Sequence, residues 1–306
     1  MQRVDGLFAE LKVLGNVIDS YNAHGSLLPS ELMPKQCGRM GMLRSGTEGL
    51  KMNFRVLISG IFLMLQTFTA LAEDAGAAPV DDSYARSIVE KADQVRFPAE
   101  GFQVDIAINT NQPDQQIETR KYRVLQKGNE NTVVMVTEPA SERGQIILMK
   151  GRDLWVFMPE VSQPVRISLA QRLTGQVANG DLARANFAAD YHPKVLRNET
   201  IKGENYVVLA LTAVDRSVTY QKVIYWVNEK NAWPLKAEFY SLSNRLLKKS
   251  SYENFQMLAG KLRPTRLVME DALRSGEVST LEYREMKLRE LPDKVFTKDY
   301  LKKLSE

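Results

Sequence analysis

The sequence predicts a mainly β protein: an incomplete antiparallel β-barrel of about 11–13 strands, with an α-helical lid over a hydrophobic cavity. Three observations support this fold class. Apolar and polar residues alternate with a period of two from residue 102 to about residue 288, which is typical of strands. The links between these segments are short, whereas parallel strands need a long crossover. Helical patterns flank this region and interrupt it once, which is too few for an α/β fold.

The first predicted element is a helix that ends near Val95. Asp81-Asp82-Ser83 supplies an N-cap and places acidic side chains where the helix dipole favours them. Ile88, Ala92 and Val95 fall on one face at helical spacing, and Phe97-Pro98 ends the helix. We expect that face to be buried.

Strands are expected next, up to residue 169. Phe102, Val104 and Ile106 alternate with polar residues, as in a strand with one buried face. Val133–Val136 and Ile146–Met149 are apolar on both faces, which indicates that lid helices or neighbouring segments cover the second face. The strands expected in this half are 102–108, 121–125, 133–136, 146–149, 154–158 and 165–169.

A short helix interrupts the strands. Asn179-Gly180-Asp181 can cap a helix that carries Leu182, Phe187 and Ala188 and ends before His192-Pro193. After it, the pattern predicts a hairpin loop at residues 202–205. The expected strands are then 206–211, 220–227, 235–240, 246–255, 262–270 and 278–288, followed by a terminal helix at 298–304.

A sheet of this length must curl, split into a sandwich or close in order to bury its apolar face. With few helices available, the economical solution is a strongly curved, unclosed barrel whose concave face is roofed by helices, which leaves an apolar hollow. A packed β-sandwich with edge helices is the alternative, and the pattern alone does not decide between them.

Residues 52–72 have the features of a cleaved export signal. A positively charged start at Met52–Arg55 precedes the apolar run Val56–Leu65, and Thr69–Ala72 ends in small residues. A run of about ten apolar residues is too short to span a bilayer. We therefore expect a periplasmic product cleaved near Ala72-Glu73, with residues 73–306 as one domain. Residues 1–51 are interpreted as a non-native or disordered upstream extension.

Composition excludes several functions. The chain has 41 Lys and Arg against 37 Asp and Glu, and the basic residues are scattered, so a nucleic-acid partner is not expected. Cys37 is the only cysteine and precedes the predicted signal, which leaves the exported product without thiols. His192 is the only histidine after the signal, so a histidine metal cluster cannot form. Asp190 nearby is interpreted as a solvated helix end.

The sequence also lacks a nucleophile elbow, a phosphate-binding glycine loop and a zinc motif. We therefore predict a protein that is not an enzyme and that needs no metal or cofactor.

The apolar residues give the stronger functional signal, although for each of them taken singly a place in the structural core is the favoured interpretation. Trp155 and Phe157 share one face of their strand, whereas Leu154 and Val156 share the other. We place the lid at Leu182–Ala189 and the first helix. The candidate lipid-binding residues of the cavity and lid are Tyr122, Val134, Ile146, Leu148, Trp155, Phe157, Ile167, Leu182 and Phe187.

Several segments together resemble one known family. They are Asp153–Pro159, Val165–Ser168 with Arg172, Trp226–Asn228 with Trp233–Lys236, Glu238–Tyr240, Arg263–Arg266 and the ending from Leu291 to Leu301. This combination resembles the LolA-like outer-membrane lipoprotein-sorting family, and it is most similar to a branch of uncharacterised periplasmic members. The similarity covers nearly all of the chain after the predicted signal.

The resemblance implies a carrier that moves acyl chains of a lipoprotein or lipid between the inner and outer membranes. It implies an inner-membrane transporter as a possible partner, and we expect a monomer. An arginine links a strand to the lid in this family, and Arg166 and Arg172 are the possible counterparts here. An envelope sensor or a transporter accessory subunit of the same fold, which binds a protein partner, remains the alternative.

Overall fold

The computed structural model describes residues 82–184 and 186–305, so the predicted signal and the segment before it lie outside the described residues. The strands are β1 (Phe102–Asn111), β2 (Glu118–Lys127), β3 (Asn131–Glu138), β4 (Ile146–Lys150), β5 (Asp153–Phe157), β6 (Val165–Ile167), β7 (Arg172–Thr174), β8 (Val177–Ala178), β9 (Tyr191–Ile201), β10 (Glu204–Ala213), β11 (Lys222–Asn228), β12 (Pro234–Tyr240), β13 (Leu246–Leu258), β14 (Lys261–Asp271) and β15 (Val278–Leu288). The helices are α3 (Ser83–Arg96), α4 (Asn179–Ala183), α5 (Phe187–Asp190) and α6 (Lys298–Ser305), with 3₁₀ turns η1 (Ala140–Glu142) and η2 (Asp293–Phe296).

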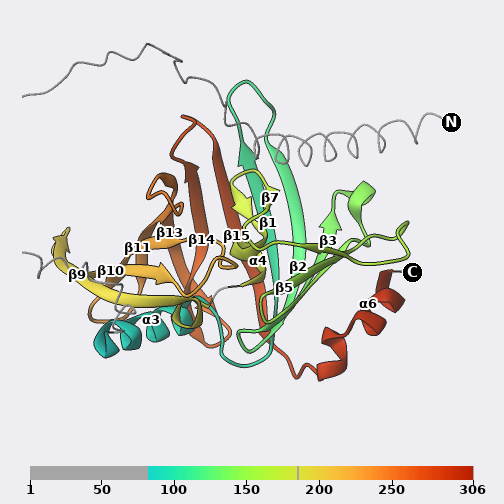
Figure 1. Ribbon diagram of the computed structural model, residues 1–306, viewed down its shortest axis with the longest axis horizontal. Coiled ribbons are helices and arrows are strands. Elements are labelled where there is room, and N and C mark those ends of the chain that lie inside the picture. The colour runs from blue at the N-terminus through green and yellow to red at the C-terminus, as the bar shows by residue number, and fades with distance from the viewer. Residues whose placement is uncertain (1–81, 185, 306) are drawn as a thin grey trace, which may run out of the picture. The chain divides into compact units, whose positions relative to one another are not determined.

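One 13-stranded sheet forms the body of the described part of the chain, in the order β6-β5-β4-β3-β2-β1-β15-β14-β13-β12-β11-β10-β9. Neighbours in this order are antiparallel, and the pairing of β1 with β15 joins the two halves of the chain. β6 and β9 are the two edges, so the sheet is not closed into a barrel. Figure 1 shows how the strand direction turns from β9–β11 through β13–β15 to β3–β5. The mainly β fold class predicted from the sequence is confirmed.

The largest apolar core lies on one face of this sheet, which we call the inner face. In β1, Phe102, Val104, Ile106 and Ile108 are at most 3% exposed and alternate with half-buried residues. Inward-facing residues of the other strands join the same cluster, together with residues of α3, α4 and α5. We call these three helices the lid.

Helix α3 is fixed at both ends. Asp82 Oδ1 accepts hydrogen bonds from the backbone N–H groups of Tyr84 and Ala85, at 3.0 and 3.1 Å, and so caps the first turn. At the other end, Arg263 of β14 is 2% exposed and donates to the carbonyls of Gln94 and Val95. The sheet therefore supplies the cation that satisfies the last carbonyls of this helix.

The middle of the chain differs from the single helix expected there. Two short helices form, because Asn186 leaves helical geometry and accepts the backbone N–H of Ala189 as the N-cap of α5. His192-Pro193, expected to follow the helix as a turn, lies in β9, a strand that the period-two pattern missed. Proline is tolerated there because β9 is an edge strand.

The opposite, outer face of β3–β5 has its own apolar cover. Val295, Phe296 and Leu301, from η2 and α6, pack with Val133 and residues of β4 and β5. This contact explains why strands 133–136 and 146–149 are apolar on both faces. It also places the terminal helix α6 on the outer face, away from the lid.

Within the described residues, no helix is both long enough and apolar enough to cross a membrane.

Candidate functional site

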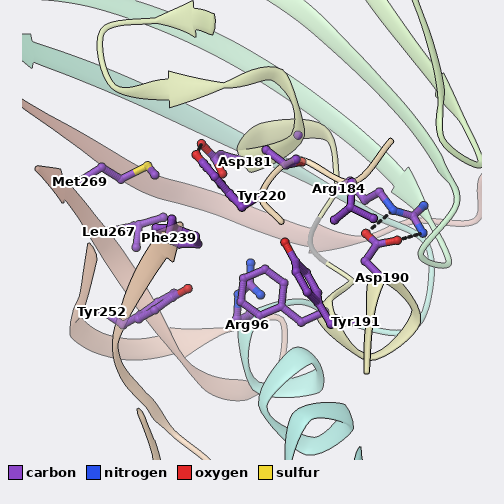
Figure 2. A pocket seen from close by; sticks show the side chains of 14 residues that line it. Arg96, Asp181, Arg184, Asp190, Tyr191, Tyr220, Phe239, Tyr252, Leu267 and Met269 are labelled. Atoms are coloured by element: carbon purple, nitrogen blue, oxygen red, sulfur yellow. Dashed lines mark hydrogen bonds and ion pairs between the residues drawn. The ribbon is translucent and has the colours of Figure 1, made fainter. Parts of the chain in front are cut away.

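The lid closes tightly on the inner face of the sheet (Figure 2). The cavity between them has a volume of about 20 Å³ and is lined by lid residues such as Asp181 and Phe187 and by Phe239, Leu267 and Met269 of the sheet. This is room for about one water molecule, whereas ligand pockets usually measure roughly 300–1,000 Å³. A chain of several carbon atoms therefore does not fit in this cavity.

A buried ion pair joins the ends of the two short lid helices, and further contacts of the same residues tie them to the sheet. Arg184 donates to both carboxylate oxygens of Asp190, at 2.5 Å from Nε to Oδ2 and 2.7 Å from Nη2 to Oδ1. Figure 2 shows the two side chains facing each other. They are only 3% and 7% exposed. Arg184 also donates from Nη1 to the carbonyls of Asn129 and Gly151, in the β2–β3 and β4–β5 turns. Arg152 adds a second ion pair to Asp190, at 3.2 Å, and we call Arg152, Arg184 and Asp190 the lid latch.

A second polar contact joins α3 to α5. Asp93 Oδ2 accepts the backbone N–H of Ala188 at 2.9 Å, in the first turn of α5. The same carboxylate pairs with Arg96 at 3.3 Å, and the Arg96 guanidinium lies 4.4 Å from the centre of the Phe187 ring. Burial raises the pKa of Asp93 to about 6, with Arg96 acting in the opposite direction. Asp93 is therefore a buried carboxyl group of the lid whose protonated form is favoured by burial.

A third polar cluster holds α4. Asp181 Oδ2 accepts from the Tyr220 hydroxyl at 2.7 Å and from the backbone N–H of Ala178 at 2.8 Å. Lys248 of β13 donates to the Tyr220 hydroxyl at 3.2 Å and to the carbonyl of Gln176. Burial raises the pKa of Asp181 and lowers the pKa of Lys248.

The close approach of α4 to the β10–β11 loop requires a glycine at position 180. A Cβ added to Gly180 would overlap Thr219 Oγ1 and lie 3.1 Å from Thr219 Cβ. The Gly180→Ala variant is expected to lower the free energy of unfolding by about 1–3 kcal/mol through overpacking. In a urea titration, the double variant with Thr219→Ala should recover part of this loss, because the overlapping hydroxyl is gone. An undiminished loss in the double variant would contradict this origin.

A second and larger hollow lies beside a separate apolar cluster on the outer face. It measures about 560 Å³. Ile201 and Leu235 border both the hollow and the cluster of Val208, Ile224 and Trp226. Trp233 and Phe255 stack along it, with ring centres 4.5 Å apart. We call this hollow the outer groove.

No group of three or more His, Cys, Asp or Glu side chains in the described part of the chain is placed to hold a metal ion.

Comparison with known proteins identifies the family. A family model described only as that of an uncharacterized protein matches residues 128–303. The crystal structure of a LolA superfamily protein from Nitrosomonas europaea matches with a TM-score of 0.69 and 68% sequence identity, over 71% of this chain and 98% of that chain. The chain belongs to the LolA superfamily. Since almost all of the relative lies within the match, a LolA domain of this kind folds without a counterpart to the rest of this chain.

Two further solved structures share the LolA fold. A DUF1329 family protein from Desulfovibrio piger has a TM-score of 0.63 and 20% identity, over 74% of this chain and all of its own. A domain described as an outer membrane lipoprotein-sorting protein, from Vibrio parahaemolyticus, has a TM-score of 0.62 and 21% identity, over 72% of this chain and 98% of its own. At these identities the likeness concerns the fold alone. No curated protein matches the chain.

Five of the nine candidate lipid-binding residues lie on the inner face of the LolA domain or in its lid. Tyr122 and Val134 are buried in the inner-face core. Leu182 and Phe187 project from the lid into the same core, and Ile167 packs at its margin. The structure brings these five together, and their binding of lipid remains a prediction.

The other four candidates lie on the outer face. Ile146, Leu148 and Phe157 are buried against the C-terminal segment, and Trp155 packs at the edge of that cluster. Side chains alternate across a strand, so the inward positions of β4 and β5 belong to their neighbours, such as Ile147 and Leu154. These four residues therefore do not line the space under the lid.

The two arginines predicted to link lid and sheet have other surroundings. Arg166 is 71% exposed and pairs with Asp153 on the neighbouring strand. Arg172 is exposed on β7, in the hairpin that leads into α4. The arginines that do lie between lid and sheet include Arg96, Arg152 and Arg184, which no sequence motif marked. Arg263 also joins the sheet to α3, and it lies in the segment Arg263–Arg266 that carries part of the family resemblance.

Asp190 was expected to be a solvated helix end. It is 5% exposed and accepts from two arginines, because α5 turns its carboxylate toward the sheet. A single acidic residue near a helix end does not reveal such burial.

Proposed function

We propose that this LolA superfamily protein binds the acyl chain of a lipid or lipoprotein in the periplasm, between its lid and the inner face of the sheet, and carries it between the two membranes. The observation that carries the proposal is the arrangement of an extended apolar inner face under short helices that polar contacts hold shut. In this proposal the protein is a monomeric carrier rather than an enzyme, and an inner-membrane transporter is its partner.

Moving an acyl chain through water without a protein to cover it costs a large amount of free energy. Each buried methylene is worth about 0.8 kcal/mol, so a chain of roughly 16 carbons exposed to water costs on the order of 10 kcal/mol. The inner face offers a replacement surface of matching chemistry, with Ile106, Tyr122, Val134 and Leu209 among its buried residues. Membership of the LolA superfamily supports the same use of this face.

In this proposal the open and closed states of the lid must differ little in free energy, because uptake and release occur where ATP is absent. α4 and α5 have five and four residues and cannot be stable alone. The ion pairs and hydrogen bonds that hold them have water as an alternative partner. A ligand or a partner protein that prefers the open state then shifts the population by its differential affinity.

One observation favours a second candidate function, the binding of a protein partner by an envelope sensor or accessory subunit. The interior is filled in the closed state, whereas the outer groove is open and carries the stacked Trp233 and Phe255. Aromatic residues are enriched in protein interfaces. In this candidate the lid would stay shut and the groove would hold the partner.

A reversible disulfide across the lid separates the two candidates. The variant Gly180→Cys/Thr219→Cys joins α4 to the β10–β11 loop across 3.1 Å between Cβ positions, a few tenths of an ångström below the usual disulfide span. The domain of residues 73–306 has no cysteine of its own. The probe is a phospholipid with a fluorescent acyl chain, and uptake from vesicles is measured before and after reduction.

The carrier proposal expects uptake by the wild type and by the reduced variant, with strong loss in the oxidised variant. Equal uptake by oxidised and reduced protein would exclude the space under the lid as the site. A wild type that takes up no lipid would overturn the carrier proposal and favour the partner-binding candidate.

A further inference from the structure

Three neighbouring hairpin tips each expose one bulky aliphatic side chain. They are Ile117 in the β1–β2 loop, Leu273 in the β14–β15 tip and Leu242 in the β12–β13 tip, with exposed fractions of 64%, 54% and 69%. Side chains of this kind are normally buried, and single exposed examples need no explanation. Exposed aliphatic side chains on three hairpins at one end of the sheet, however, require an explanation.

The tips are adjacent in space as well as in strand order. The β14–β15 tip approaches the β1–β2 loop so closely that a Cβ on Gly276 would lie 3.1 Å from Pro113 Cγ. In Figure 1 these two tips stand beside each other at the upper end of the sheet. On the other side, the backbone N–H of Ala272 donates to the carbonyl of Leu247, at the start of β13. We call the set of Ile117, Leu242 and Leu273 the aliphatic rim.

The same tips carry cations. Arg245 and Arg274 are exposed in the tips that hold Leu242 and Leu273, and Arg216 is exposed in the adjacent β10–β11 loop.

Two of the nearby acidic side chains, Asp271 and Asp215, are engaged within their own loops, whereas Asp114 is exposed in the loop of Ile117 and Glu277 pairs with Arg274 at 3.3 Å. Asp271 Oδ1 accepts the backbone N–H groups of Leu273 and Arg274, at 2.7 and 3.0 Å. Asp215 accepts the backbone N–H of Ser217 at 2.7 Å and pairs with Arg152.

We infer that the aliphatic rim docks the protein on an anionic lipid bilayer, with the three side chains inserted at the headgroup boundary and Arg216, Arg245 and Arg274 facing the lipid phosphates. Aliphatic anchors beside arginines are the chemistry of membrane-surface binding. A protein partner fits less well, because the apolar side chains stand on separate tips and leucine is under-represented among interface hot spots. This docking goes beyond the proposed function and holds whether or not the interior takes an acyl chain.

The rim lies at the end of the sheet reached by the hairpin β7–β8. The backbone N–H of Gln176 donates to Ser279 Oγ at 2.9 Å, and the Gln176 side chain donates to Glu277, next to the β14–β15 tip. Two residues after Gln176, Ala178 is the N-cap of the lid helix α4. A bilayer that binds the rim therefore lies close to the segment on which the lid is hinged.

Vesicle flotation tests the inference with the domain of residues 73–306. The vesicles are phosphatidylcholine mixed in equal parts with phosphatidylglycerol, and pure phosphatidylcholine serves for comparison. The rim variant is Ile117→Glu/Leu242→Glu/Leu273→Glu. The matched control is Met257→Glu, because Met257 is 64% exposed near the opposite end of β13. Circular dichroism and thermal melting verify that each variant is folded.

The wild type and the Met257→Glu control should float with the anionic vesicles, and the rim variant should lose about tenfold or more in bound fraction. Replacing Arg216, Arg245 and Arg274 by Gln should weaken binding to anionic vesicles and reduce its sensitivity to salt. A wild type that ignores anionic vesicles would overturn the inference, and so would a folded rim variant that binds like the wild type. Neither result would bear on the disulfide experiment at Gly180 and Thr219.

Discussion

Replacing Arg184 by Ala is expected to lower the free energy of unfolding by about 3–5 kcal/mol. The reason is the burial of its partner. Asp190 is 5% exposed, and without Arg184 its carboxylate keeps only the longer ion pair to Arg152. The carbonyls of Asn129 and Gly151 also lose their donor in the folded state. Removing one member of a buried pair costs far more than the pair itself is worth, because the remaining charge stays out of water.

Urea denaturation of the domain of residues 73–306 measures this loss. Arg184→Lys should give an intermediate result, because one ammonium keeps the charge but cannot match two carboxylate oxygens and two carbonyls. Arg166→Ala is the control. Its ion pair with Asp153 is exposed, so its removal should change the free energy of unfolding by about 0.5 kcal/mol or less. If the two alanine variants behaved alike, the lid latch would not be a stabilising element.

This contrast also shows what the sequence can reveal about the site. Both arginines are single basic residues without a motif, and their spacing does not distinguish them. Arg184 becomes a latch because folding brings the β2–β3 and β4–β5 turns, more than thirty residues away, to within hydrogen-bonding distance. Such a contact depends on strand curvature and not on any local pattern. The periodic elements were predictable for the opposite reason, because alternation and capping are local.

The sequence predicted only in part which strand residues point to the inner face of the sheet and which point to the outer face. In β5 the alternation correctly separated Trp155 and Phe157 from Leu154 and Val156. Both sets are apolar, however, so the pattern could not tell which set faces the lid. The deciding element is the C-terminal segment, whose Phe296 and Leu301 cover the outer face. β9 was missed because its exposed edge carries a polar run and a proline, which weaken the strand pattern.

A second large effect is expected in the pH dependence of stability. The folded protein raises the pKa of Asp93 from 3.8 to about 6 by burial, against the opposing charge of Arg96. Between about pH 4 and pH 6 the folded state therefore holds a proton that the unfolded state has lost. Stability from this group must fall as the pH rises through that window, and the loss persists above pH 6. Two pKa units correspond to about 3 kcal/mol.

Asp93→Asn should remove this dependence. The amide oxygen can still accept the backbone N–H of Ala188, and the side chain never ionises, so the variant resembles the protonated wild type. At pH 8 we expect the variant to be more stable than the wild type by up to about 3 kcal/mol, and near pH 4 the two should be alike. Urea denaturation at several pH values measures both curves.

The control for this experiment is Asp153→Asn, the same change at a carboxylate that is 48% exposed and lies outside the lid. An Asp93→Asn variant that is less stable than the wild type at pH 8 would show that the Arg96 pair outweighs burial. Whether Asp93→Asn stabilises or destabilises the protein at pH 8 matters for the lid, because Asp93 joins α3 to the first turn of α5. If ionised Asp93 is a net cost, the closed lid is held least firmly above pH 6, and mild acidification should tighten it. Hydrogen exchange of the Ala188 amide, compared between pH values after correction for intrinsic exchange, reports that change directly at the contact.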